Sequence, residues 1–182
     1  MNQNYPNTYT QISDETKLSG FDMASDGLTC SLLRTLASSK CAGKFLELGT
    51  GTGLSTAWIL DGMDENSSLT SIDNDEKFIA IANKYLSNDS RLDLITIDGG
   101  RWIEENKGNQ YDYIFADTWH GKYLLLNDVL AMLNKGINYI GLASHEIRNL
   151  SHRLAPAFFD DTTLEEAFKT LLKTFNVENS QH

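Results

Sequence analysis

Short strand-like runs that contain apolar residues alternate along the chain with longer stretches of helical spacing. The short runs, which can enter buried strands, lie at residues 45–48, 68–72, 92–97, 111–116 and 137–142. Stretches with apolar residues three or four positions apart lie at residues 26–36, 55–60, 76–86, 123–133 and 163–175. Strands that alternate with helices in this way predict an α/β fold with a parallel sheet.

The two ends of the chain lack this pattern. Residues 1–17 are polar and rich in Asn and Thr, which predicts a mobile arm. Residues 176–182 have the composition of a tail. The chain has 182 residues, and this length favours one domain that covers residues 1–182.

Three glycines at alternate positions follow the first apolar run. Gly49, Gly51 and Gly53 can adopt positive φ and let a ligand approach the backbone, and the helix at 55–60 would direct free N–H groups at that ligand. A dinucleotide fingerprint, G-x-G-x-x-G, needs its third glycine where this chain has Leu54, which disfavours a nicotinamide dehydrogenase. The alternative, a plain connection between strand and helix, stays open.

Acidic residues recur at the ends of the predicted strands. Glu47 lies within the first strand, and Asp73, Asp98 and Asp117 follow the next three. Because ligands bind outside the carboxyl ends of parallel strands, these side chains are expected to line one site. Asp73 would accept hydrogen bonds from both ribose hydroxyls of a nucleoside. Its alternative role is the N-cap of the helix at 76–86.

Composition narrows the class of partner. The chain has 15 Lys and Arg against 25 Asp and Glu, a formal charge of −10 and a sequence pI near 4.7. A protein that binds nucleic acid needs a basic face, so a small-molecule acceptor is favoured over nucleic acid. The sequence shows neither a signal-like N-terminus nor an apolar stretch of ~18 residues, so we expect a cytoplasmic protein with no membrane partner. Cys30 and Cys41 are expected to be free thiols.

Two segments carry a resemblance to a known family. Residues 47–53, E-L-G-T-G-T-G, resemble the first motif of class I S-adenosylmethionine-dependent methyltransferases. Residues 111–126, Y-D-Y-I-F-A-D-T-W-H-G-K-Y-L-L-L, together with the Met-Ala-Ser triplet at 23–25, are similar to the catechol and caffeoyl-CoA O-methyltransferase-like group. The resemblance implies a Rossmann-like, doubly wound, mostly parallel sheet. It also implies transfer of a methyl group from S-adenosylmethionine to a hydroxyl of a small acceptor, such as a phenol or catechol.

The same resemblance distributes the cofactor along the edge of the sheet. The methionine part would lie over the glycine turn, the ribose against Asp73, and the adenine between Asp98 and Trp119. Met23 would lie near the sulfonium and the entering acceptor. The residues expected to contact the cofactor are Met23, Glu47, Gly49, Gly51, Gly53, Ser55, Asp73, Asp98, Gly99, Arg101, Asp117 and Trp119.

In this group, the residue at Asp117 would also be the first ligand of a divalent cation, with Mg²⁺ preferred. An Asp-Asn pair after the fifth strand completes that metal site, but this chain has Ser144, His145 and Glu146 there. Hard cations prefer oxygen ligands, so Ser144 and His145 are poor replacements, although Glu146 could supply one carboxylate. Asp117 is the metal ligand that we predict, and the need for a metal stays open.

The candidate bases follow the tryptophan. Catechol O-methyltransferases carry a lysine directly after it, where this chain has His120. An imidazole can accept a proton at neutral pH, so we expect His120 to be the base, with Lys122 and Asp117 as the other catalytic residues. The alternative is that His120 is an exposed turn residue and the proton goes to solvent. The aromatic residues expected to wall the pocket are Trp119, Tyr123 and Trp102.

The region after the fifth predicted strand departs most from the group. The group's fold closes with a helix and an antiparallel strand pair, and only the helix at 163–175 is found here. The strand pair is therefore expected to be missing or altered, with the sheet edge covered by residues 148–161 or by a partner, for example in a homodimer. The missing acid pair keeps a second function open, an S-adenosylmethionine-binding protein without transferase activity.

Overall fold

The computed structural model describes residues 5–140, and side chains as far as residue 134. These residues belong to one compact unit, Met1–Leu142. The predictions for the helix at 163–175, the tail, the strand pair and Glu146 lie outside the described residues. The prediction of one domain for the whole chain therefore stays a prediction.

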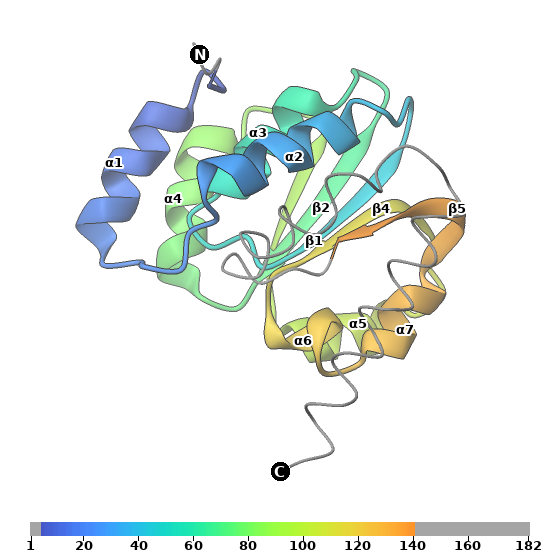
Figure 1. The fold of residues 1–182 in the computed structure, drawn as a ribbon. Helices are drawn as coiled ribbons and strands as arrows, with labels where there is room; N and C mark the ends of the chain where they lie inside the picture. Colours follow the sequence, from blue (N-terminus) through green and yellow to red (C-terminus); the bar gives the residue numbers. More distant parts are fainter. Residues whose placement is uncertain (1–4, 141–182) are drawn as a thin grey trace. The chain divides into compact units, whose positions relative to one another are not determined.

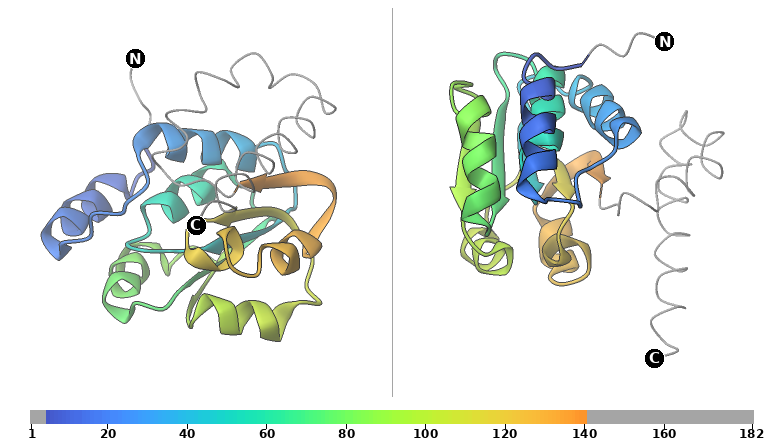
Figure 2. Two further views of the ribbon diagram at one scale, coloured as in Figure 1. Left: turned by 60° about the horizontal axis from the view of Figure 1, so that its bottom comes forward. Right: turned by 90° about the vertical axis from the view of Figure 1, so that its left-hand side faces the viewer.

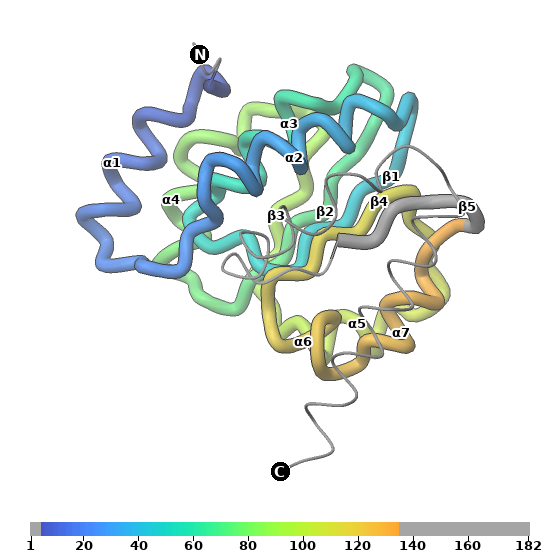
Figure 3. The backbone as a smooth tube through the Cα atoms, in the orientation of Figure 1, coloured from blue at the N-terminus to red at the C-terminus, as the bar shows by residue number. Residues whose placement is uncertain are grey.

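A parallel sheet forms the centre of the unit, with its strands in the order β3-β2-β1-β4-β5 (Figure 1). The strands are β1 (Lys44–Leu48), β2 (Ser68–Asp73), β3 (Leu92–Thr96), β4 (Tyr111–Ala116) and β5 (Leu133–Ile140). All four neighbouring pairs run parallel, and β1 lies beside β4 although they are far apart in the sequence (Figure 3). The strand order reverses between these two strands, as in doubly wound folds, so the predicted fold class is confirmed.

Helices cover both faces of the sheet (Figures 1 and 2). One face carries α1 (Tyr9–Ser19), α2 (Gly27–Ala37), α3 (Leu54–Gly62) and α4 (Glu76–Leu86). The other carries α5 (Gly99–Asn106), α6 (Trp119–Lys122) and α7 (Leu126–Ala131). No helix within residues 5–140 is long and apolar enough to cross a membrane.

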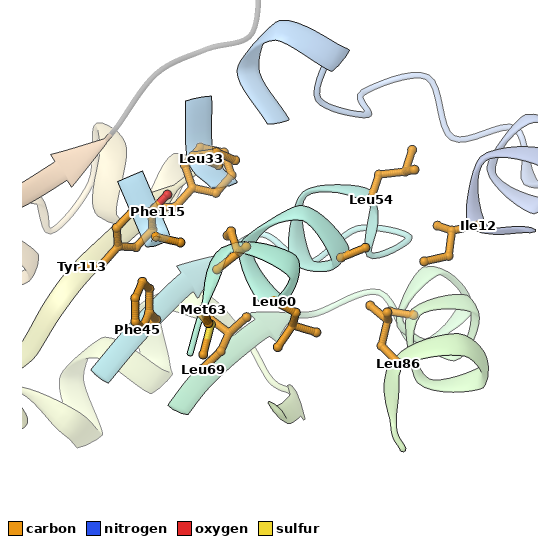
Figure 4. Close-up of a cluster of buried hydrophobic side chains, with 14 residues drawn as sticks. Ile12, Leu33, Phe45, Leu54, Leu60, Met63, Leu69, Leu86, Tyr113 and Phe115 are labelled. Carbon is orange, nitrogen blue, oxygen red and sulfur yellow. The ribbon is translucent and has the colours of Figure 1, made fainter. Parts of the chain in front are cut away.

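Each face of the sheet has its own hydrophobic core. Phe45 packs with Tyr113 and Phe115 beneath α2 and α3 (Figure 4), whereas Leu46 and Leu48 belong to the core under α5 and α7. Side chains alternate along a strand, so consecutive residues of β1 enter opposite cores. Burial on both faces explains why β1 and β4 have apolar residues at both alternating sets of positions.

The mobile arm predicted for residues 1–17 is wrong in its described part. Helix α1 packs against α3 and α4 (Figure 1). Ile12 is fully buried, and the Thr16 hydroxyl lies 2.7 Å from the Thr52 hydroxyl. Apart from Ile12 and the partly buried Tyr9, α1 is held mainly by polar contacts. Such a helix carries little apolar periodicity, which is why the pattern did not indicate it.

The helix predicted at 123–133 is also different in the structure. Leu125 has φ +58°, a left-handed conformation that separates α6 from α7. Strand β5 begins at Leu133, four residues before the predicted start at 137. Helix α5 was not predicted. These differences lie in the connections, and they leave the strand order unchanged.

Candidate functional site

The glycine turn, residues 49–53, connects β1 to α3. Gly49, Gly51 and Gly53 have φ values of +111°, +51° and +90°, in the region that favours glycine. A Cβ atom on Gly51 would lie 2.8 Å from Cζ of Phe21, a contact too short for any larger residue without movement. The turn therefore requires glycine for both conformation and space.

Asp73 holds the glycine turn from the end of β2. Its Oδ2 accepts a hydrogen bond from the Gly51 N–H at 2.7 Å, and its Oδ1 accepts one from the Asp75 N–H at 3.0 Å. The N-cap of α4 is Asp75, so the alternative role of Asp73 as that N-cap is wrong. A carboxylate has about four acceptor positions, which leaves Asp73 about two for a ligand.

Glu47 lies beneath the glycine turn and not on the cavity surface. It is fully buried, and its carboxylate accepts hydrogen bonds of 2.6 Å from each of Ser55, Thr56 and Ser71. Burial raises the pKa of Glu47 to about 7, against the three hydroxyl donors, which lower it. Glu47 thus ties β1 to β2 and α3 and supports the turn from below.

A cavity of about 550 Å³ opens at the carboxyl ends of β1, β2 and β4. It brings together most residues expected to contact a cofactor, namely Met23, Gly49, Gly51, Ser55, Asp73, Asp98, Gly99, Asp117 and Trp119. His120 and Lys122 line it as well. Glu47, Gly53 and Arg101 are not among its lining residues.

Two aromatic residues of the cavity were missed by the sequence analysis. Phe21 and Phe78 pack with their ring centroids 4.6 Å apart, and both line the cavity beside Asp73. Phe21 belongs to the loop between α1 and α2, and Phe78 to α4. No motif in the sequence links these two residues, so only the packing of α1 against α4 could reveal them.

The end of the cavity at α5 holds Asp98 and His120. Asp98 is the N-cap of α5, and its Oδ1 accepts a hydrogen bond from the Arg101 N–H at 2.9 Å. The guanidinium of Arg101 is exposed and pairs with Glu105 at 2.7 Å. A Cβ on Gly100 would lie 2.9 Å from Nε2 of His120, so the imidazole packs against the first turn of α5.

Asp117 follows β4 and is paired on both sides. Lys122 Nζ lies 3.4 Å from its Oδ1, and Ser25 Oγ lies 3.3 Å from its Oδ2. The side chains of Lys122 and Asp117 are only 10% and 19% exposed. Burial raises the pKa of the Asp117 carboxyl, while the charge of Lys122 and the hydrogen bonds from Lys122 and Ser25 lower it.

A tight turn directs Lys122 toward Asp117. Gly121 has φ +82°, and a Cβ there would lie 2.5 Å from Cδ1 of Leu48. Its N–H donates to the Leu124 carbonyl at 2.7 Å. The backbone of α6 therefore passes directly over the end of β1, and this approach brings Lys122 to the end of β4.

Within the described residues, the side chains around Asp117 do not make up a divalent-cation site. Within residues 5–134, no three His, Cys, Asp or Glu side chains gather in a metal-binding arrangement. The carboxylate faces an ammonium group, which has no lone pair to offer, and a hydroxyl. The residues that would complete the site, 144–146, lie outside the described residues.

Aromatic residues border the cavity beside Lys122. Trp119 and Tyr123 are 71% and 44% exposed, with ring centroids 5.2 Å apart. Met23, 71% exposed, lines the same cavity. Trp102, expected to wall the pocket, is instead buried in the core near Tyr111. The open rim thus presents flat apolar surface beside a charged pair.

Comparison with known proteins gives a family match and close similarities of fold. Residues 46–137 match the family described as "Methyltransferase domain". A protein of Mycobacterium leprae with a provisional O-methyltransferase name is 33% identical over 96 residues, which are 50% of this chain and 42% of that protein. The chain therefore spans less than half the length of this curated relative.

The solved structures that resemble the fold include two O-methyltransferases. The O-methyltransferase from Bacillus cereus in complex with SAH is 18% identical, with a TM-score of 0.69 over 92% of this chain and 79% of that one. TomG from Streptomyces achromogenes, an O-methyltransferase solved with SAM, is 15% identical, with a TM-score of 0.65 over 82% of this chain and 78% of that one. At these identities the similarity concerns the fold.

Proposed function

The chain belongs to the methyltransferase domain family, and on this premise we propose that it transfers the methyl group of S-adenosylmethionine to a hydroxyl oxygen of a small acceptor. The observation that supports this most is the hydrogen bond between Asp73 and the Gly51 N–H on the cavity surface. It joins a carboxylate suited to ribose hydroxyls to a turn suited to the methionine part of the cofactor.

The residues around the cavity support a position for each part of the cofactor. The ribose hydroxyls would donate to the remaining acceptor positions of Asp73. Helix α3 has no side-chain N-cap, so its first N–H groups are suited to the methionine carboxylate. Asp98 and Gly99 would border the adenine, with Phe21 and Phe78 beside the nucleoside.

Methyl transfer has two requirements that the protein must meet. It must align the acceptor oxygen with the methyl carbon and the sulfur, and it must help the acceptor hydroxyl to lose its proton. Of the two candidate bases, His120 packs against the first turn of α5, whereas Lys122 pairs with Asp117. This geometry favours Lys122 and Asp117 as the acceptor side of the site and His120 as a contact of the adenine side.

Calorimetry with the full chain tests the proposal. We expect S-adenosylmethionine and S-adenosylhomocysteine to bind and NAD to show no binding. Methyl transfer to a panel of phenols and catechols is then measured. If both sulfur compounds bind and no acceptor is methylated, the alternative of a cofactor-binding protein without transferase activity is favoured.

The proposal also includes the type of molecule on which the chain acts. A formal charge of −10 supports a small-molecule acceptor and opposes a nucleic acid. The cytoplasmic location and the homodimer stay predictions, which fractionation of cells and light scattering on the purified chain would test.

A further inference from the structure

The Lys122–Asp117 pair is the least exposed ion pair in the described part of the chain. Its side chains are 10% and 19% exposed, whereas in each of the other pairs both partners are more than 20% exposed. Enclosed charges are costly unless each is compensated. In this pair the ammonium compensates the carboxylate directly, and the Ser25 hydroxyl adds a hydrogen bond on the other oxygen.

This pairing already supplies a positive charge at the position where related enzymes would need a metal. A Mg²⁺ ion bound to Asp117 would lie about 2 Å from a carboxylate oxygen. The Lys122 ammonium lies 3.4 Å from Oδ1, so the two cations would be close neighbours with little water to screen them. Lys122 therefore opposes binding of a cation to Asp117.

The aromatic rim indicates what kind of molecule would approach the ammonium. Lys122 Nζ lies 5.6 Å from the ring centroid of Tyr123, and that ring contacts Trp119. An ammonium has three N–H donors, so it can hold Asp117 and still donate to a ligand oxygen. A flat aromatic acceptor could stack on the exposed rings while its oxygen reaches Lys122.

We propose that Lys122 takes the place of a divalent cation, so that the chain methylates an aromatic acceptor carrying a single hydroxyl group without a metal. A catechol is required where two adjacent oxygens chelate a metal, whereas an ammonium needs only one oxygen. This inference rests on the proposed function and specifies its acceptor.

The step balances without a further reactant. The proton of the acceptor hydroxyl passes to water at the mouth of the cavity. The oxygen anion, held by the ammonium of Lys122, forms a C–O bond with the methyl carbon as the C–S bond breaks. The sulfur keeps the electron pair of that bond, and the products are the methyl ether and S-adenosylhomocysteine.

The test uses the full chain and three variants. Lys122→Met removes the charge at similar length, and Lys122→Arg keeps the charge. Lys107→Met is the matched control, because Lys107 pairs with Asp128 at 3.3 Å outside the cavity. We expect Lys122→Met to lower kcat/KM for a monophenol such as 4-methylphenol by about 100-fold, Lys122→Arg by about tenfold or less, and the control to match the wild type.

The affinity for S-adenosylhomocysteine separates a local effect from misfolding. We expect calorimetry to give values within about threefold of the wild type for all three variants. Turnover of the monophenol by the wild type is expected to be equal in excess EDTA and in Mg²⁺. Titration of Mn²⁺ into the complex with S-adenosylhomocysteine is expected to show no binding to the wild type.

Other outcomes would overturn the inference. These are loss of turnover in EDTA with recovery in Mg²⁺, binding of Mn²⁺ to the wild type, methylation of catechols alone, or an unchanged kcat/KM in Lys122→Met. In each of them S-adenosylmethionine still binds, and the proposed cofactor stands. Absence of S-adenosylmethionine binding would instead overturn the proposed function and this inference with it.

Discussion

At the scale of single residues, three acids at neighbouring strand ends differ in what surrounds them. Glu47 is enclosed by hydroxyl donors, Asp73 contacts backbone N–H groups at the cavity surface, and Asp117 faces an ammonium. Their order in the sequence makes them look equivalent. Their different surroundings give them different roles. Glu47 supports the glycine turn, Asp73 is a candidate acceptor for the ribose hydroxyls, and Asp117 is one member of an ion pair.

Replacing Asp73 by Ala is expected to weaken binding of S-adenosylhomocysteine by about 10- to 100-fold, because charged hydrogen bonds to the ribose are lost. Calorimetry measures the change. Asp14→Ala is the control, since Asp14 is an exposed residue of α1 that pairs with Lys17. An affinity for Asp73→Ala equal to that of the control would contradict the ribose role.

The raised pKa of Glu47 predicts that the stability of the folded chain depends on pH. Its pKa is raised from 4.5 to about 7 in the folded chain, so the folded state binds more protons than the unfolded state between these values. Glu47 therefore contributes most to the free energy of unfolding below about pH 4.5. This contribution is lost as the pH rises through about 7. The free energy of unfolding, measured with urea across this pH range, should fall less steeply with rising pH for Glu47→Gln than for the wild type. Identical pH slopes would show that Glu47 does not titrate in this way.

At the scale of elements, the helices with the weakest apolar pattern contribute directly to the site. Helix α1 precedes the loop that brings Phe21 against Gly51, and α6 carries Lys122. The contacts that hold them include the buried side chain of Ile12 in α1 and the close approach of Gly121 in α6 to Leu48. Their contribution to the site can be tested by changing those contacts.

Ile12→Ala should lower the free energy of unfolding by about 2–5 kcal/mol, because it leaves a cavity in the core between α1 and its neighbours. Chemical denaturation gives the value. Leu18→Ala on the same helix is the matched control, since Leu18 is 87% exposed and its loss should cost less than about 0.5 kcal/mol. Equal effects of the two changes would mean that α1 does not pack as described.

Gly121→Ala should cost about 1–3 kcal/mol of unfolding free energy, because alanine is strained at φ +82° and its Cβ would collide with Leu48. The same change should lower turnover, since it moves Lys122 away from Asp117. Gly108→Ala provides the comparison, because a Cβ there meets nothing within 4 Å. The prediction fails if both variants unfold at the same denaturant concentration.

At the scale of the whole described unit, the cavity exists because parallel strands place their carboxyl ends together. The change of strand order between β1 and β4 leaves a crevice between the loops that follow them. The glycine turn, Asp73 and Asp117 come from three different loops and meet there. No single segment contains the site.

Ligand binding should therefore stabilise the unit as a whole. S-adenosylhomocysteine at about 100 times its Kd is expected to raise the unfolding free energy by about 2.7 kcal/mol and to raise the Tm. NAD at the same concentration should leave the Tm unchanged. Thermal unfolding followed by circular dichroism measures both, and a larger shift with NAD would contradict the proposed ligand.

The sequence alone determined most of the sheet and the edge at which the candidate site lies. Apolar runs form buried strands, and glycines at alternate positions form a turn. Both features can be predicted because they depend on residues that are neighbours in the sequence. These features predicted β1 to β4, the glycine turn, and the place of Asp73 and Asp117 on one cavity.

Only the tertiary structure decided which neighbours each side chain meets. It buried Glu47, turned Arg101 to the surface, packed His120 against α5 and paired Lys122 with Asp117. These outcomes depend on contacts between segments far apart in the chain and on a left-handed turn at Gly121. Residue spacing encodes such contacts weakly, because it records what a segment prefers and not what lies beside it.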